Sequence, residues 1–258
     1  MELLIDNELK HVIYGEPYKI SDAFTVYNPF LEDISNFGEE EYWRLVSTVV
    51  SRPYDAMVKL DDMGLNYQKI SEYIFFLMQA IHLEKSKTEI LFGLEFDFQQ
   101  CTIMSTNDSS ENNENNVFLV DSSGKTVFDQ MTYVRMVQYI RYIHFFSEKV
   151  EFDVGNEVSR KRLIDRMRRK QQREEKRKKP FESVLSGLVS SIVNVPGSSY
   201  TYESTKKMHI SQLYDAYVRY NRITSYNQTM GGVYAGTVSY KDLDHSLLEW
   251  SGSIHKND

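Results

Sequence analysis

Few residues of this sequence stand at spacings that metal binding or nucleophilic catalysis requires. No two of the six histidines lie three or four residues apart on a predicted helix, which argues against a local metal site. The only cysteine, Cys101, follows a predicted strand without a base beside it, so we expect an inert, buried thiol and no intramolecular disulfide. His82 and His144 each end an apolar predicted helix, where we expect either packing or capping, in which a protonated imidazole interacts with the helix dipole, and not catalysis.

The tetrapeptide SGKT at residues 123–126 has the order that ends a phosphate-binding loop. That motif requires a glycine five residues before Gly124, but Leu119 stands there, within a predicted strand. We therefore predict a turn between two strands, with a positive φ at Gly124. Asp61 and Asp62 could bind Mg²⁺, although a solvated helix end is the better interpretation. These motifs predict no enzyme, no cofactor and no small-molecule substrate.

The main electrostatic feature is a basic segment in an acidic chain. Residues 160–179 hold twelve Lys or Arg and three Asp or Glu, a balance of +9, whereas the rest holds 18 basic and 34 acidic residues, a balance of −16. Within the segment, Arg166, Arg168, Arg169 and Arg173 are the candidate partner-binding residues.

Three interpretations of the basic segment stay open. It is a solvated connector, or a docking site for an acidic partner or for the chain's own acidic N-terminal half, or a binding site for nucleic acid. Nucleic acid is the least favoured of these partners. Glu174 and Glu175 lie among the basic residues, aromatic residues that could stack on bases are missing, and the acidic remainder would repel a polyanion.

Three tyrosines on a late predicted helix form the second candidate partner-binding group. Tyr214, Tyr217 and Tyr220 follow one another at intervals of three residues, so they share a helix face. Exposed, they would suit binding to another protein, because tyrosine buries a large area with few rotatable bonds. Ordinary packing in the core is an equal alternative.

Hydrophobic periodicity predicts a strand at residues 18–27 and then several short helices. Apolar residues recur at helical spacing up to Gly38, and again from there towards Pro53. A short helix follows and ends at Gly64. We expect Asn66 to cap the next helix, which reaches residue 81.

The pattern changes to period two at residues 94–99, which predicts a strand, and residues 117–120 form a second one. Between them, residues 105–116 are rich in Asn and predict a flexible loop. Asp129 is the expected N-cap of a long helix.

Helix is expected to resume through the basic segment and to end at residue 179, because Pro180 disfavours helix in the residue before it. Residues 181–195 and 209–225 predict two further helices, and the three glycines of residues 230–237 predict irregular backbone.

Together these elements predict a mainly α (α+β) fold with many helices, a small antiparallel β-sheet or hairpin and a long basic helix at residues 156–179. We expect an N-terminal subdomain of a strand and small helices at residues 1–93. A β-hairpin follows at 94–128, and a helical half at 129–258. The longest apolar stretch, residues 73–81, is too short to span a bilayer, and the cysteine content suits a reducing cytoplasm.

Three stretches resemble a family of proteins that are encoded in the tail modules of phages infecting Gram-positive bacteria. Residues 28–77 contain FGEEEYW and SRPYDAMVKLDDMGLNYQKISEYIFFL; residues 128–144 read FDQMTYVRMVQYIRYIH; residues 185–237 contain LVSSIVNVPGSSYTYES and MGGVYAGT. These stretches cover 120 of the 258 residues, in order, and none is a catalytic motif. The sequence departs from the family in its Asn-rich loop and in GSSYTYES, where a bulkier aromatic residue is expected after the glycine.

The resemblance implies an assembly chaperone or scaffold that binds phage tail or baseplate-hub proteins in the host cytoplasm. It implies no enzyme, metal or nucleotide. Self-association is a further option, and membranes are not expected partners. The first alternative is a permanent component of the virion, in the tail, baseplate or neck. A nucleic-acid-binding accessory protein that uses the basic helix ranks below both.

Overall fold

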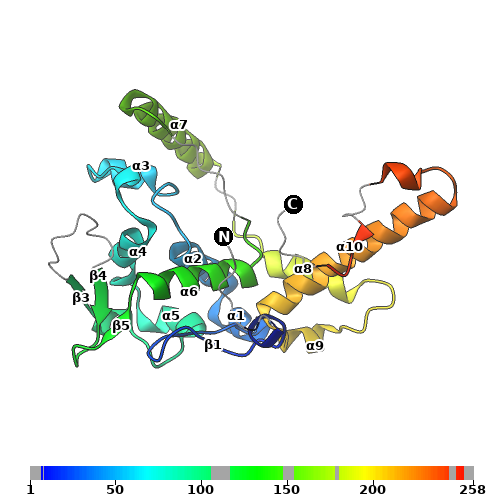
Figure 1. Cartoon of the computed structure of the whole chain (residues 1–258), viewed down its shortest axis with the longest axis horizontal. Coiled ribbons are helices and arrows are strands. Elements are labelled where there is room, and N and C mark those ends of the chain that lie inside the picture. The colour runs from blue at the N-terminus through cyan, green and yellow to red at the C-terminus, as the bar shows by residue number, and fades with distance from the viewer. Residues whose placement is uncertain are drawn as a thin grey trace.

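Helices dominate the computed structural model of the chain (Figure 1), which describes residue 7 and residues 9–105, 117–147, 154–177, 180–243 and 248–252. The elements before the long basic helix are η1 (Leu9–Ile13), β1 (Tyr18–Lys19), β2 (Thr25–Val26), α1 (Leu31–Phe37), α2 (Glu39–Val49), α3 (Met57–Asp62), η2 (Tyr67–Lys69), α4 (Glu72–Ala80), α5 (Lys85–Phe92), η3 (Phe98–Gln100), β3 (Thr102–Ser105), β4 (Val117–Val120), β5 (Thr126–Phe128) and α6 (Gln130–Ile143). The later elements are α7 (Glu157–Lys176), α8 (Val184–Val193), α9 (Tyr202–Lys206), α10 (Ile210–Tyr234) and η5 (Tyr240–Asp242).

Two small antiparallel sheets accompany the helices. One pairs β1 with β2, and the other has the strand order β3-β4-β5. The predicted mainly α fold with a small antiparallel sheet is therefore confirmed. Among the described helices, none is long and apolar enough to cross a membrane.

The single strand predicted at residues 18–27 is a two-stranded hairpin. Tyr18 pairs with Val26, and the chain reverses between them because the N–H groups of Ile20 and Ser21 both donate to the carbonyl oxygen of Phe24, at 3.0 and 3.1 Å. The turn aims the Phe24 ring into the core, where it is fully buried. Aromatic and β-branched residues predicted extended backbone correctly but did not reveal the reversal.

Local capping explains the helices that follow. Gly38, at φ 99°, separates α1 from α2, and Gly64, at φ 73°, follows the end of α3, as predicted. The prediction for Asn66 was wrong. Its side chain accepts from the N–H of Gln68 and caps only the short η2, whereas Ser71 accepts from Ile74 and begins α4.

The strand predicted at residues 94–99 is absent. Asp97 accepts a hydrogen bond from the N–H of Gln99 at 3.0 Å and starts the 3₁₀ turn η3, so β3 begins only at Thr102. Phe96 and Phe98 are nevertheless both buried, with ring centroids 4.9 Å apart. Both rings contact Phe24, so the alternating pattern arises from packing in one aromatic cluster and not from a strand.

The predicted turn between two strands is confirmed at residues 121–125, which join β4 to β5. Gly124 has φ 79°, and the Asp121 carboxylate accepts from the N–H groups of Ser123 and Lys125. Of the predicted Asn-rich loop, Ser105 ends β3, and residues 106–116 lie outside the described part of the chain.

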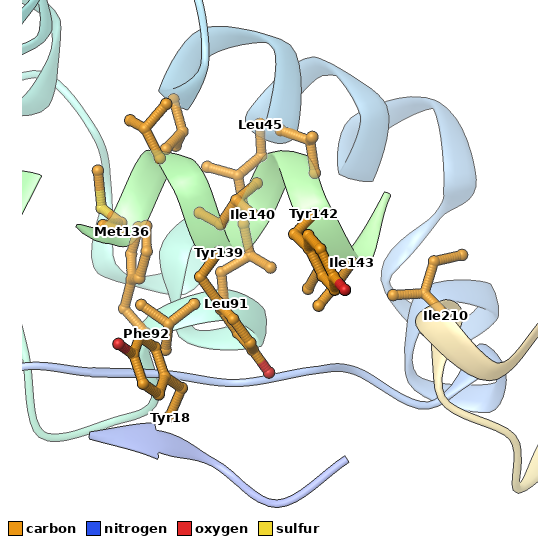
Figure 2. Packing of buried hydrophobic residues seen from close by; sticks show 14 of the residues in the cluster. Tyr18, Leu45, Leu91, Phe92, Met136, Tyr139, Ile140, Tyr142, Ile143 and Ile210 are labelled. Carbon is orange, nitrogen blue, oxygen red and sulfur yellow. The ribbon is translucent and has the colours of Figure 1, made fainter. Parts of the chain in front are cut away.

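Helix α6 is the centre of the main hydrophobic core (Figure 2). Asp129 caps it, as predicted, by accepting from the N–H of Thr132 at 2.8 Å. Figure 2 shows side chains of α2, α5, β1 and the start of α10 gathered round it. The labelled residues are Tyr18, Leu45, Leu91, Phe92, Met136, Tyr139, Ile140, Tyr142, Ile143 and Ile210. Helix α6 thus joins elements from both halves of the sequence.

His144 follows α6 and is buried, with 1% of its surface exposed. Its Nδ1 lies 2.6 Å from the carbonyl oxygen of Ile140, which can only accept, so Nδ1 carries the proton. Nε2 therefore accepts from the Tyr42 hydroxyl, 2.6 Å away. Burial lowers the pKa of His144 from 6.5 to about 4. The expected protonated imidazole is a neutral one, because the site is inside the core.

The C-terminal helices depart from prediction at the glycines. Helix α10 continues through Gly231 and Gly232 and ends before Gly236, which has φ 74°. The returning chain explains this. The N–H groups of Thr237 and Val238 donate to the carbonyl oxygen of Gly232, and a Cβ at Gly232 would lie 2.9 Å from the Val238 side chain. Glycine there permits close approach and does not break the helix.

A buried polar junction fastens the N-terminal segment to the start of α10. Asn28 Nδ2 donates to Ser211 Oγ at 2.7 Å, and that hydroxyl donates to the carbonyl oxygen of Val12 at 2.7 Å. His209 Nδ1 donates to the carbonyl oxygen of Asn28. Gly15 lies against the same histidine, since a Cβ on Gly15 would come within 2.1 Å of the ring. In Figure 1, η1 accordingly lies beside α9 and the base of α10.

The Ser211→Ala variant tests this junction. Removing the hydroxyl leaves the Asn28 amide and the Val12 carbonyl without partners inside the protein, which should lower the free energy of unfolding by about 1–3 kcal/mol. Urea denaturation followed by circular dichroism measures it. Ser225→Ala, at an exposed position of the same helix, is the control and should change little. Equal effects of the two variants would contradict the role given to the junction.

The buried His144 predicts a pH dependence of stability. Because its pKa is about 4 when folded and 6.5 when unfolded, the unfolded chain binds more protons between these values. The stabilisation is complete above pH 6.5 and is lost as the pH falls towards 4, by on the order of 3 kcal/mol. Burial also lowers the pKa of His209, which adds in the same direction. Urea unfolding at about pH 7, 5.5 and 4.5 measures the free energy of unfolding. With decreasing pH it should fall less steeply for His144→Gln than for the exposed control His82→Gln. Equal falls in the two variants would refute the assignment.

Candidate functional site

The long basic helix α7 exists as predicted, with Asn156 as its N-cap. The Asn156 side chain accepts from the N–H of Ser159 at 2.8 Å, and the helix runs to Lys176. Twenty residues make it about 30 Å long. The last two residues of the predicted helix, 178 and 179, lie outside the described residues.

One face of α7 packs against the N-terminal half of the chain. Ile164 is 1% exposed and inserts between α3, η2 and α4, with Leu163 and Met167 beside it. The resulting satellite cluster consists of Met57, Val58, Leu60, Tyr67, Phe75 and Ile164. It is separate from the main core around α6. In Figure 1, α7 lies beside α3 at the margin of the molecule.

Arg168 reinforces this docking with charge. Its guanidinium donates to Asp61 at 3.0 Å and to Asp62 at 2.6 Å, and lies 3.5 Å from Asp165. The hydrogen bonds that Arg168 donates to Asp61 and then to Asp62 raise the pKa of Arg168 above its ordinary value. The two aspartates considered as Mg²⁺ ligands thus hold an arginine. Of the interpretations left open for the basic segment, docking onto the chain's own acidic half applies to this face.

The opposite face of α7 carries a basic stripe, formed by Arg162, Arg166, Arg169, Arg173 and Lys176. These residues follow at intervals of four, three, four and three, so they share one face, and all five are exposed. Within the described residues, no carboxylate pairs with Arg162, Arg166, Arg173 or Lys176. Arg166, Arg169 and Arg173 were candidates from sequence. Arg162 and Lys176 were missed, although counting at helical spacing would have found them.

Two of the three acidic residues within residues 160–179, Glu174 and Glu175, lie off the stripe, and the third, Asp165, is 3.5 Å from Arg168. Glu174 is 3.8 Å from Lys170, with which it forms an exposed pair along the helix. At 100° per residue, Glu174 and Glu175 both fall more than a quarter turn from Arg173 towards the far side of α7. The stripe therefore keeps its positive charge.

The three candidate tyrosines of α10 have different surroundings. Tyr214 stacks on Phe145 with ring centroids 5.5 Å apart, and burial raises its pKa to about 12. Tyr217 is half-buried against the main core. Tyr220 lines a cavity of about 210 Å³ between α10 and the loop after α8. Tyr214 and Tyr217 thus contribute to packing, and Tyr220 is nearest to a binding surface.

That cavity is an unpromising small-molecule site. Its walls come from Ala216 and Tyr220 of α10 and from the loop that contains Pro196 and Tyr200. A volume of about 210 Å³ is below the roughly 300 Å³ at which ligand pockets usually begin.

The outer half of α10 projects away from the core (Figure 1) and is covered by its own C-terminal strap, residues 238–243 and 248–252. Arg219 holds the strap by donating to the carbonyl oxygens of Trp250 at 2.6 Å and Gly252 at 2.9 Å. Residues 223–239 contain no charged side chain, in a chain that is 26% charged.

An uncharged outer face remains open on this projecting helix. Tyr220, Asn227 and Tyr234 are seven residues apart and define this α10 outer face. Tyr234 is 83% exposed. Sequence reasoning missed Tyr234, and the uncharged run was the signal that could have found it, because the centres of protein interfaces are depleted of charge and enriched in tyrosine.

The described residues were compared with the requirements of a metal site and of a reactive thiol. In the parts of the chain that the structure covers, no group of three or more His, Cys, Asp and Glu could hold a metal ion. Cys101 is half-buried, and burial, followed by the nearby Asp97, raises the pKa of its thiol. A thiol protonated at neutral pH is a poor nucleophile.

The C-terminal part of the chain matches a known family. Residues 175–255 match a family model described as the YomV second domain, a family associated with bacteriophages. The matched segment takes in α8, α9, α10 and the C-terminal strap, and leaves the basic stripe almost wholly outside. No curated protein and no solved structure matches the chain.

The Ile164→Ala variant tests how α7 is docked. Truncating this buried side chain should weaken the docking of α7 by about 2–4 kcal/mol, because it leaves a cavity in a small cluster. Hydrogen exchange should then be faster in the amides of α7 and α3, and unchanged in α6. Gln172→Ala, exposed on the same helix, is the matched control. Exchange that accelerates equally in α6 would mean that the two clusters unfold together.

Proposed function

We propose that this chain is a non-enzymatic bacteriophage assembly protein that acts by binding other phage proteins. The observation that carries the proposal is the match of residues 175–255 to a phage-associated domain family. Those residues include the outer half of α10, which projects from the core, whereas Leu185, Ile192 and Ile210 pack within the core itself.

We infer further that the partners are tail or baseplate proteins, bound by the chain as a chaperone or scaffold. Support comes from the sequence resemblance of residues 28–77, 128–144 and 185–237 to tail-module proteins. The last of these stretches overlaps the segment that matches the phage-associated domain. A permanent place in the virion is the alternative that the experiment below separates from a transient role.

The α10 outer face is the proposed partner-binding surface. Tyrosine and asparagine offer large contact area and adaptable hydrogen bonding, and no charge has to be desolvated there. The base of α10 is fixed by the buried junction with Asn28, so the face is presented on a rigid helix. A preorganised surface loses less conformational entropy on binding.

The surroundings of the candidate chemical groups support a non-enzymatic role. The thiol of Cys101 has a raised pKa, and the cavity beside Tyr220 has a volume of only about 210 Å³. His144 is engaged on both ring nitrogens. None of these groups lies where a substrate could meet both an acid and a base.

Affinity-tagged protein, purified from infected cells, should co-purify with tail or baseplate proteins that mass spectrometry identifies. Tyr234→Ser should reduce that recovery at least about tenfold, because an exposed tyrosine at the centre of an interface is often a dominant contact. Tyr14→Ser, which removes another exposed tyrosine, 63% exposed and at the opposite end of the sequence, is the matched control.

Purified particles decide between the two roles. Absence of the protein from particles, with partners present in the lysate, indicates a chaperone. Stoichiometric presence indicates a virion component. Recovery without any tail or baseplate protein in either sample would refute the proposal.

A further inference from the structure

The basic stripe of α7 is a straight row of positive charge that no part of the described chain neutralises. From Arg162 to Lys176 it extends about 21 Å, with successive cations about 6.0 and 4.5 Å apart along the axis. Ile164 and Arg168 hold the opposite face against α3, so the row points to solvent at a fixed angle. Such a rigid row suits a ligand with regularly spaced anions.

We propose that the basic stripe binds the phosphate backbone of duplex nucleic acid without regard to base sequence. This is a function beyond the protein-binding role proposed above, and it uses a different helix. Four of the five residues are arginines, whose guanidinium groups donate two parallel hydrogen bonds to a phosphate. Nucleic acid of any sequence offers an even row of phosphates, whereas an acidic protein would need carboxylates placed to match.

Because α7 contains no aromatic residues, we expect the stripe to bind duplex rather than single-stranded nucleic acid. Residues 157–177 contain no Phe, Tyr, Trp or His on which an unpaired base could stack. The stripe also has no Asn and no Gln to read base edges. We assign its arginines to the phosphates, rather than to guanine edges, because their even spacing follows the backbone.

Two objections from sequence lose force in the structure. Glu174 and Glu175 lie off the stripe, towards the far side of the helix. Asp61 and Asp62 are behind α7, where both pair with Arg168. A helix is about 10 Å thick, which is close to the distance over which 0.1 M salt screens charge, so the acidic body repels a duplex on the outer face only weakly.

The number of contacts fixes the expected salt dependence. Five neutralised phosphates predict that the logarithm of the binding constant falls with the logarithm of salt concentration with a slope of about −4.5. Binding of this kind has dissociation constants of roughly 10⁻⁴ to 10⁻⁶ M at physiological salt, and tighter at lower salt.

Fluorescence anisotropy of a labelled mixed-sequence DNA duplex of about 20 base pairs, titrated with the full chain at several salt concentrations, tests the proposal. The stripe variant carries Arg162→Gln, Arg166→Gln, Arg173→Gln and Lys176→Gln. It should bind at least about tenfold more weakly at low salt, and its slope should shrink to about −1, since Arg169 remains. Glutamine favours helix nearly as well as arginine, and circular dichroism checks that α7 is retained.

The matched control removes the same four charges from exposed lysines elsewhere: Lys87→Gln, Lys125→Gln, Lys206→Gln and Lys207→Gln. It should keep the slope of the unmodified chain. Failure of the unmodified chain to bind the duplex at low salt, or equal losses in both variants, would overturn the proposal. So would a Glu-rich helical peptide that binds the stripe more tightly than the duplex does, which would assign the stripe to an acidic protein. The co-purification of tail or baseplate proteins tests the α10 outer face. Its result does not depend on whether the basic stripe binds DNA.

Discussion

The arrangement of the molecule depends on a buried set of hydrogen bonds between two segments that are far apart in sequence. Asn28 and Ser211, 183 residues apart, pair inside the protein. Around them, the backbone of Leu31 donates to Met208 at 2.9 Å, and that of Ile210 donates to Pro29 at 3.0 Å. A shift of either segment would break these buried hydrogen bonds and leave the Asn28 Nδ2 donor and the Val12 carbonyl without partners. The junction therefore sets the direction in which α10 leaves the core, and with it the position of the α10 outer face.

Much of the fold could be predicted from sequence because its causes are local. Asp129 caps α6 through a neighbour three residues away, and Gly124 supplies the φ that the β4–β5 turn needs. Prediction from local sequence failed where one side chain is compatible with two backbone conformations. Asp97 occupies the polar position of an apparent strand pattern, but its carboxylate caps a 3₁₀ turn. The burial of Phe96 and Phe98 is the same in either case, so periodicity alone could not distinguish them.

The candidate sites were less predictable, since they depend on contacts between distant elements. Arg168 looked equivalent to its basic neighbours, yet Asp61 and Asp62 engage it more than a hundred residues away. Only the placement of α7 on α3 separates an inner face, where Arg168 is paired with aspartates, from an outer face whose basic residues pair with no carboxylate among the described residues. Likewise, a histidine at a helix end suggested a charged imidazole, and only the packing of Tyr42 against His144 reveals a neutral one. The residue types can be read from the sequence, but the pairing of Arg168 and the protonation of His144 depend on tertiary packing.

The projecting half of α10 has an evolutionary consequence. Beyond Tyr220 no described residue of the helix belongs to the main core, so the length of this outer part is not constrained by the core. Insertion or deletion of seven residues changes the reach of the helix by about 10 Å and returns the same face to almost the same angle. The distance to which α10 projects can thus differ between related chains without any change in the packing of the main core. A short stretch of uncharged helix would then adapt one scaffold to assemblies of different dimensions.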